Sequence, residues 1–303
     1  MNRKKIKKIT VFGGAGFMGQ HLVNALSGRC EEIVVFDRQK SKNLPPMARM
    51  VIGDILDSSA VTEAIKDSDL VFNLAGLADI DECINKPLEA VTTNILGTTN
   101  LLQECVQSNV ERFVFSSTLY VYSRVGGIYR ATKKACEELI EEYSQQFGVS
   151  YIILRFGTIY GPNSNLQNSI YRYLTQALET GVIEFPGNGQ EMREYIHVFD
   201  AVEQSISLAI NGSPNRKYLI TGNHPTRAAD LFELIGEVIG KNIDVKYNPK
   251  AEGHSSHYQI SPYAYREDHA LKISNPQYID LGQGILDLVH HLQSTKNKGQ
   301  YQY

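Results

Sequence analysis

Near its start the chain carries Ile9-Thr10-Val11-Phe12-Gly13-Gly14-Ala15-Gly16-Phe17-Met18-Gly19-Gln20-His21-Leu22. This stretch reads as a short buried strand, a glycine-dense turn and the start of a helix, with no spacer between them. Its glycines fit two overlapping spacings, Gly14-x-Gly16-x-x-Gly19 and Gly13-x-x-Gly16-x-x-Gly19. Glycine permits positive φ in a tight turn, leaves bare backbone for a diphosphate to approach and lets the helix pack closely on the strand. The pattern predicts a phosphate-binding turn.

A dinucleotide is the first ligand that this turn suggests. The exposed N–H groups and the positive dipole end of a helix that begins near Gly16 would hold the diphosphate. A glycine-rich turn without a ligand is the alternative, but the flanking strand and helix favour the ligand. The next apolar run ends in Asp37, about 20 residues further on, where a carboxylate accepts the ribose hydroxyls. Asp37 favours NAD over NADP, and the adjacent Arg38 softens that preference.

Composition limits the classes of function. The chain has 303 residues, 42% of them hydrophobic, which suits a large domain with a smaller lobe. A formal net charge of −3 gives no reason to expect nucleic acid or an acidic membrane as a partner. No apolar run approaches the ~20 residues of a membrane helix. Because Cys30, Cys83, Cys105 and Cys136 have no CxxC or metal-ligand spacing, we expect a cytoplasmic protein with reduced thiols, no metal and no disulfide.

Five further apolar runs follow the first, and helical segments separate them. Runs of this kind are typical of parallel strands buried on both faces. We therefore expect a doubly wound parallel α/β sheet (a Rossmann fold) in residues 1–160 and a smaller substrate-binding lobe in residues 161–303, with some later segments returning to the sheet domain. The lobe is expected to contain a strand at 217–220. The other expected strands are 32–37, 50–54, 70–76, 112–117 and 151–157, and the expected helices are 58–66, 87–107, 129–147, 170–180, 227–239 and one after Gly282.

Tyr129 and Lys133 lie four residues apart in a predicted helix, so they project from one face. A phenol with a reference pKa of ~10 is a poor base at neutral pH unless a nearby cation stabilises the phenolate. Such a pair alone arises easily by chance. Here it follows a strand that ends in Ser116-Ser117-Thr118, whose last hydroxyl is suited to bond a substrate oxygen during proton transfer. The pattern favours Tyr129 as the acid/base and Lys133 as the group that tunes it.

The order of these residues resembles the extended short-chain dehydrogenases/reductases, in particular their sugar-nucleotide epimerase/dehydratase group. The resemblance runs from about Lys8 to Asp200 and more faintly to Leu292. Together its motifs are highly specific: Gly13-x-x-Gly16-x-x-Gly19, Asp37, Gly53-Asp54-Ile55, Asn73-Leu74-Ala75-Gly76, Asn94-x-x-Gly97-Thr98, Ser116-Ser117-Thr118, Tyr129-x-x-x-Lys133, Arg155-Phe156-Gly157-Thr158-Ile159-Tyr160-Gly161-Pro162 and Arg193-Glu194-Tyr195-Ile196-His197-Val198-Phe199-Asp200.

The resemblance implies NAD as cofactor and a nucleoside-diphosphate sugar as substrate. It implies Thr118 as the hydroxyl partner, Tyr129 as the acid/base and Lys133 on the nicotinamide ribose. Arg193 is expected near the substrate diphosphate, with a solvated surface charge as the alternative reading. The other substrate-binding positions are Thr118, Thr158 and Asn163, and the cofactor-binding positions are Gly13, Gly16, Phe17, Met18, Gly19, Asp37, Asp54 and Ile55 (at the adenine), Leu74, Ala75, Gly76, Asn94, Ser116, Tyr129 and Lys133.

The chain departs from the group at three places. Ten residues separate Thr118 from Tyr129, where relatives usually have a longer loop over the sugar, so we expect an open site. The dehydratase branch carries an Asp-Glu pair directly after the hydroxyl position, and Leu119-Tyr120 stands here, which disfavours β-elimination. The late Arg-Pro-Gly-Asp segment of relatives is replaced by His254 to Arg266.

The sequence therefore predicts an NAD-dependent nucleoside-diphosphate-sugar 4-epimerase that oxidises C4 and reduces it again from the other face. A 4-dehydrogenase or 4-ketoreductase would use the same residues and stays open as the alternative. A non-catalytic NAD-binding sensor is disfavoured, because it would not need Tyr129 and Lys133 at this spacing. The sequence leaves the base and the sugar open.

A homodimer is the expected assembly. The two helices 87–107 and 129–147 must each bury one face on the sheet, and both carry additional apolar positions. The resemblance implies that these helices pair across a two-fold axis as a four-helix bundle. The apolar positions in question are Leu96, Leu101, Leu139 and Ile140.

Overall fold

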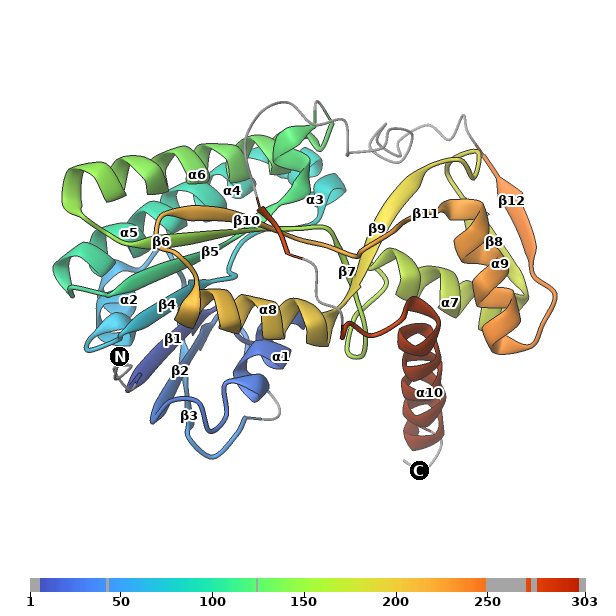
Figure 1. Ribbon diagram of the computed structural model, residues 1–303, viewed down its shortest axis with the longest axis horizontal. Helices are drawn as coiled ribbons and strands as arrows, with labels where there is room; N and C mark the ends of the chain where they lie inside the picture. The colour runs from blue at the N-terminus through green and yellow to red at the C-terminus, as the bar shows by residue number, and fades with distance from the viewer. Residues whose placement is uncertain (1–5, 42–43, 124, 249–270, 274–276, 300–303) are drawn as a thin grey trace. The chain divides into compact units, whose positions relative to one another are not determined.

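The computed structural model describes residues 6–41, 44–123, 125–248, 271–273 and 277–299 (Figure 1). The chain forms two compact units, and both are discontinuous in sequence. The first contains the described residues within Met1–Phe156, Val202–Ile220 and Tyr265–Ile273, and the second those within Gly157–Ala201, Thr221–Ala264 and Ser274–Tyr303. The segment His254 to Arg266 lies outside the described residues.

The first unit is built on a sheet of eight parallel strands in the order β13-β10-β6-β5-β4-β1-β2-β3. Its central strands are apolar runs because helices cover both faces. The strand order reverses between β1 and β4, and open α/β sheets bind ligands beyond the carboxyl ends of the strands at such a point. The strands are β1 (Lys8–Phe12), β2 (Glu32–Asp37), β3 (Ala48–Ile52), β4 (Leu70–Asn73), β5 (Arg112–Thr118), β6 (Tyr151–Phe156), β10 (Arg216–Ile220) and β13 (Leu271–Lys272).

Helices cover this sheet in two layers, with α4, α5 and α6 on one face and α1 and α8 on the other (Figure 1). A buried cluster that includes Phe12, Val71, Phe113 and Ile153 fills the space between the sheet and the first layer. The doubly wound fold expected from the sequence is confirmed. The helices of this unit are α1 (Phe17–Ala25), α2 (Ser58–Ile65), α3 (Ile80–Asn85), α4 (Pro87–Val91), α5 (Gly97–Gln107), α6 (Gly127–Phe147) and α8 (Val198–Asn211), whose first four residues belong to the second unit.

The expected helix 87–107 is three pieces, because a π-helical segment (Thr92–Leu96) separates α4 from α5. The prediction that four apolar positions face a partner chain is wrong for two of them. Leu101 and Ile140 are fully buried in the core of their own chain, whereas Leu96 is 51% exposed. The exposed apolar side chains of this region are Ile84, Leu88, Val91 and Leu96.

The second unit has its own core of aromatic and aliphatic side chains, which includes Tyr173, Phe185 and Phe232 packed edge to face. Residues 158–160, expected at the end of the sheet domain, form a strand of this unit. Its sheets are β11-β9-β7 and β12-β8. The elements are β7 (Thr158–Tyr160), α7 (Ser169–Thr180), β8 (Val182–Phe185), β9 (Met192–His197), β11 (Pro225–Arg227), α9 (Ala228–Ile239), β12 (Asp244–Tyr247) and α10 (Leu281–Gly299).

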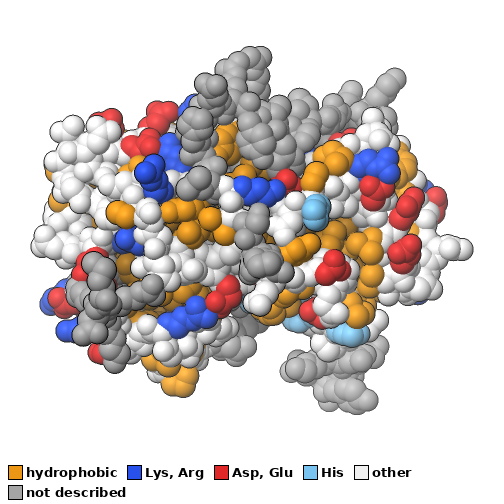
Figure 2. All heavy atoms as spheres, viewed as in Figure 1, with side chains coloured by type: hydrophobic (Ala, Val, Ile, Leu, Met, Phe, Trp, Pro, Cys, Tyr) orange, Lys and Arg blue, Asp and Glu red, His pale blue; other side chains and the backbone are white. Residues whose placement is uncertain are grey.

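Charges of both signs are interspersed on the face drawn in Figure 2, as the small net charge leads one to expect. All four cysteines are buried free thiols. Burial raises the pKa of Cys30 and of Cys83 to about 11, so both are protonated at neutral pH and unreactive. Within the described residues, no helix is long and apolar enough to cross a membrane.

Candidate active site

The glycine turn joins β1 to α1 directly beside the end of β4. Gly13 has φ +76°, and a Cβ there would lie 2.6 Å from the backbone nitrogen of Ala75. A Cβ on Gly19 would overlap the carbonyl oxygen of Gly13. Because Gly16 caps α1, the first-turn N–H groups of Phe17 and Met18 have no partner within the helix. The local geometry is that of a phosphate-binding turn.

A hollow opens beside this turn, wholly within the first unit. A dinucleotide fits its composition, because bare glycine backbone, a strand-end carboxylate and apolar side chains lie together there. Asp37 accepts hydrogen bonds from the backbone N–H of Ala15 and of Gln39, both at 3.0 Å. Each carboxylate oxygen keeps a further lone pair for a ribose hydroxyl. The residues that line the hollow are Gly13, Gly16, Phe36, Asp37, Arg38, Gly53, Ile55, Leu74, Ala75, Gly76 and Thr93.

The predicted adenine residues form a short clamped loop after β3. Ile55 is 5% exposed and packs over Gly97, where a Cβ would lie 2.7 Å from its Cγ2 atom. Asp54 accepts the backbone N–H of Leu56 at 2.9 Å, and Asn100 donates to the Ile55 carbonyl at 3.2 Å. Ile55 thus presents an apolar wall to the hollow, and Asp54 braces the loop that carries it.

Asn94 lies in the π-helical segment and is 2% exposed. Its side chain accepts the backbone N–H of Leu77 at 2.7 Å and donates to the Leu77 carbonyl and to Thr132, both at 3.0 Å. Asn94 therefore ties the strand end after β4 to α6. π-Helical segments within helices are frequent at functional sites.

Tyr129 and Thr118 meet at the carboxyl end of β5. Thr118 caps the 3₁₀ turn Leu119–Tyr122, where its Oγ1 accepts the backbone N–H of Tyr120 at 3.2 Å. Its hydroxyl proton is thus left to donate, and Tyr129 lies close enough for Thr118 to lower the pKa of the phenol. The structure brings together the hydroxyl and the phenol that the sequence predicts to share a site.

Lys133 is 4% exposed and lies one turn after Tyr129 on α6. Its Nζ donates to the Ser116 carbonyl at 2.8 Å and lies 4.8 Å from the Phe115 ring centroid and 5.9 Å from that of Tyr129. A Cβ on Gly76, which lines the hollow, would be 3.8 Å from this nitrogen. Lys133 makes no ion pair among the described residues, so its remaining N–H donors are available to a ligand in the hollow.

Burial shifts the pKa values of both Tyr129 and Lys133. It raises the pKa of Tyr129, and the hydrogen bond to Thr118 opposes that rise. It lowers the pKa of Lys133, and the nearby Glu137 carboxylate works in the opposite direction. Pairs of groups with displaced pKa values are typical of acid/base sites.

The remaining predicted substrate residues belong to the second unit. Thr158 begins β7 and is half-buried, and Asn163 is exposed with φ +63°. Arg193 lies in β9, is 9% exposed and donates to the Met192 carbonyl at 2.8 Å. The alternative reading of Arg193 as a solvated surface charge is therefore wrong.

Four residues that line the hollow are not among the predicted cofactor-binding positions: Phe36, Arg38, Gly53 and Thr93. Phe36 and Gly53 come from neighbouring strand ends, and a Cβ on Gly53 would lie 2.6 Å from the Phe36 ring. The sequence could have indicated Phe36 and Gly53, because residues next to a strand-end carboxylate lie at the same edge of the sheet. Thr93 gives no such signal, since its position depends on the π-helical segment.

The model of the NAD dependent epimerase/dehydratase family matches residues 9–221 of the chain. The chain belongs to this family. It is therefore an NAD-dependent enzyme, and its hollow, Thr118, Tyr129 and Lys133 all lie inside the matched region.

Similar proteins carry out several reactions. The chain is 26% identical over 278 residues to an uncharacterized UDP-glucose epimerase, YtcB, of Bacillus subtilis (82% of this chain, 87% of that one). It is 30% identical over 264 residues to a UDP-N-acetyl-alpha-D-glucosaminuronate decarboxylase of Bacillus cytotoxicus (75% and 80%). The UDP-glucose 4-epimerase of Thermotoga maritima, solved with UDP-glucose, has the same fold, with a TM-score of 0.83 at 24% identity over 95% of this chain and 99% of that one.

Proposed function

We propose that the protein is a nucleoside-diphosphate-sugar 4-epimerase. The observation that carries this proposal is that Thr118, Tyr129 and Lys133 lie together, with the Lys133 ammonium next to Gly76, which lines the hollow that suits a dinucleotide. An acid/base and a cofactor at one place are what the reversible oxidation of a secondary alcohol requires.

NAD, when bound, supplies the acceptor of the C4 hydrogen, the donor that returns it and a positively charged ring. As the C4–H bond breaks, Tyr129 takes the proton of the C4 hydroxyl and a C4 ketone forms. Thr118 donates a hydrogen bond to that oxygen. Lys133 holds a cofactor hydroxyl, and its charge favours the Tyr129 phenolate against the effect of burial. In the second half Tyr129 returns the proton, and the opposite face of the ketone is reduced.

The segment after Thr118 supports epimerisation over dehydration. β-Elimination needs an acid and a base next to the ketone. Leu119 is 3% exposed and Tyr120 is partly buried, and both belong to the 3₁₀ turn that Thr118 caps. This turn offers no carboxylate at the position where the dehydratase branch carries its Asp-Glu pair.

The alternative is a 4-dehydrogenase or 4-ketoreductase, which would use the same three side chains. The short connection between Thr118 and Tyr129 favours it, because an epimerase must keep its ketone from leaving. The two reactions are separated by incubating the enzyme with candidate nucleotide sugars, without and with added NAD. A C4 epimer without lasting absorbance of reduced cofactor supports the epimerase. Stoichiometric NADH with a ketone product would establish the dehydrogenase instead.

We also propose Thr158, Asn163 and Arg193 as substrate-binding residues. An arginine forms short charge-assisted hydrogen bonds to phosphate, and Arg193 is buried rather than solvated. Arg193→Met should therefore raise KM for the nucleotide sugar while the Kd for NAD stays the same. Equal KM in the variant and the wild type would remove Arg193 from the site.

A homodimer is part of the proposal. Ile84, Leu88, Val91 and Leu96 are between 42% and 78% exposed and lie on consecutive elements, α3, α4 and the π-helical segment. Exposed apolar side chains gathered in one region mark an interaction surface. A second copy of the chain would cover them.

A further inference from the structure

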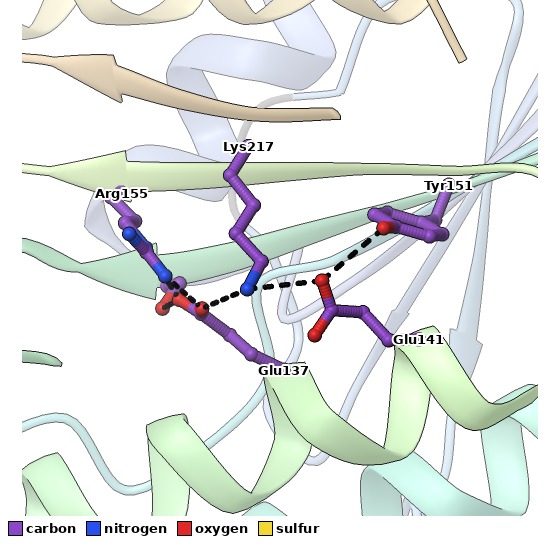
Figure 3. Close-up of polar contacts among 6 residues, drawn as sticks. Glu137, Glu141, Tyr151, Arg155 and Lys217 are labelled. Carbon is purple, nitrogen blue, oxygen red and sulfur yellow. Dashed lines mark hydrogen bonds and ion pairs between the residues drawn. The ribbon is translucent and has the colours of Figure 1, made fainter. Parts of the chain in front are cut away.

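The Glu137 carboxylate lies at the centre of a buried polar network in the first unit (Figure 3). It accepts hydrogen bonds from Arg155 Nε at 3.0 Å and from Arg155 Nη2 at 2.5 Å. The Ser117 hydroxyl also donates to it. The side chains of Arg155 and Glu137 are 0% and 3% exposed. Lys217 lies 3.7 Å from Glu137 and 3.0 Å from Glu141, so the network reaches β10.

Three consecutive residues of β5 contact three successive turns of α6. Ser117 pairs with Arg155 in the parallel register of β5 and β6, and it bonds Glu137. The carbonyl of the preceding Ser116 accepts a hydrogen bond from Lys133, and the following Thr118 lies beside Tyr129. The three α6 residues are four positions apart, so they lie along one side of the helix.

Arg155 also contacts the segment that follows Thr118. Its guanidinium lies over the ring of Tyr122 at 4.5 Å, and Tyr122 ends the 3₁₀ turn that Thr118 caps. One side chain therefore touches both the helix that carries Tyr129 and the turn that holds Thr118. Because a guanidinium is planar and rigid, it fixes both partners in angle as well as distance.

Stability alone does not account for this arrangement. A buried ion pair is often no more stabilising than two apolar side chains of the same volume. It does hold one geometry, because any displacement leaves a buried charge unpaired. Acid/base catalysis needs such a fixed geometry, since small displacements of reacting groups cost much of the rate.

We infer that Glu137 is a positioning residue which, together with Arg155, fixes Tyr129 and Lys133 on α6 relative to Thr118 on β5. The inference rests on the proposed roles of Tyr129 and Lys133. The Glu137 charge has a second effect, because it raises the pKa of Lys133 against the effect of burial. Removal of that charge should lower the pKa of Lys133 further.

Two substitutions distinguish the positioning effect of the Glu137 side chain from the effect of its charge. Glu137→Asp keeps the charge and shortens the side chain by one methylene, whereas Glu137→Gln keeps the length and removes the charge. Both should lower kcat by about tenfold to a hundredfold, with little change in KM or in the Kd for NAD. Only Glu137→Gln should move the pH profile of kcat, and it should move it to lower pH. Glu141→Asp and Glu141→Gln, one turn later on the same helix, are the matched controls, with kcat expected within about twofold of wild type.

The titration of Tyr129 supplies a readout that needs no substrate. The ultraviolet difference spectrum of the full chain, minus that of Tyr129→Phe, follows the Tyr129 phenolate directly. Its midpoint should shift in Glu137→Gln, where the surroundings of Tyr129 change, and stay in place in Glu141→Gln. If the wild type turns over no nucleotide sugar, the proposed function fails and this titration still tests the inference.

The inference is overturned if both Glu137 variants are folded and keep kcat within twofold of wild type. It is also overturned if kcat falls only as far as the folded fraction does, with an unchanged Tyr129 midpoint. Should neither variant fold, Ser117→Ala decides, because it removes one bond to Glu137 and leaves every charge in place. A several-fold loss of kcat is then expected, and unchanged kcat would contradict the inference.

Discussion

Tyr129 lies beside both Thr118 and Lys133, and its hydroxyl is the part of the side chain that we propose to react. Tyr129→Phe removes only that oxygen and should lower kcat by ~10²–10⁴. The Kd for NAD should stay the same, because the ring remains. Tyr143→Phe is the matched control, since Tyr143 lies on the same helix and its hydroxyl contacts Gln103, at 3.5 Å, among the side chains that the structure describes. Near-wild-type kcat in Tyr129→Phe would remove it from the chemistry.

The buried charge of Lys133 lowers the stability of the folded chain, although the proposed reaction needs it. Burial lowers its pKa, so its charge is less stable in the folded chain than in the unfolded chain. This cost is fully present below the folded pKa and disappears as the pH rises towards the unfolded value. Lys133→Met should therefore raise Tm by a few degrees at neutral pH, with a smaller gain in alkaline solution, while kcat falls. Calorimetry at two pH values checks this, and a lower Tm in the variant would contradict it.

The sequence predicts where single residues lie when their surroundings are local. Gly13 and Gly16 lie in one turn and Asp37 ends the neighbouring strand, and the structure places all three around one hollow. The sequence did not indicate a buried role for Glu137, because a carboxylate on an amphipathic helix ordinarily faces solvent. Its role depends on Arg155, 18 residues away on another element.

At the scale of elements, the pair between α6 and β6 makes a prediction about stability. Arg155→Met leaves the Glu137 carboxylate buried without its main partner, which costs ~3–5 kcal/mol of unfolding free energy. The double variant Arg155→Met/Glu137→Leu removes both charges and should recover much of that loss. Urea unfolding of the two variants measures the difference. A double variant less stable than Arg155→Met would show that the ion pair is not the source of the loss.

Local patterns predict where elements begin but not how helices are interrupted. The segment 87–107 shows the periodicity of one helix, yet Thr92–Leu96 is π-helical, and its Asn94 side chain bonds the chain at Leu77. Leu101 and Ile140 were expected to face a partner. They are buried because α5 and α6 pack against each other as well as on the sheet, and sequence periodicity does not reveal that packing.

For the whole molecule, local patterns do not identify which of the later segments returns to the sheet of the first unit. The strand at 217–220 was expected in the smaller lobe, and β10 instead pairs with β6 in the sheet of the first unit. Its position depends on hydrogen bonds between residues about 60 positions apart, which local propensity does not record.

The proposed homodimer makes a prediction at the same scale. The chain should sediment as a dimer at micromolar concentration. Leu88→Asp/Leu96→Asp should give monomers, because each substitution would bury charge in the interface. Leu166→Asp, at a side chain 58% exposed in the second unit, is the matched control and should leave the dimer intact. A monomeric wild type at micromolar concentration would refute the proposal.

The central claim is that C4 of the sugar is oxidised and reduced again on the same bound cofactor. Substrates deuterated at C4 test it directly, because the hydrogen taken from C4 can be located in the product by mass spectrometry and NMR. An epimerase returns the deuterium to C4, so the account predicts an inverted product that retains the label there. Label transferred to C6, found in released NADH or lost to water would contradict the account.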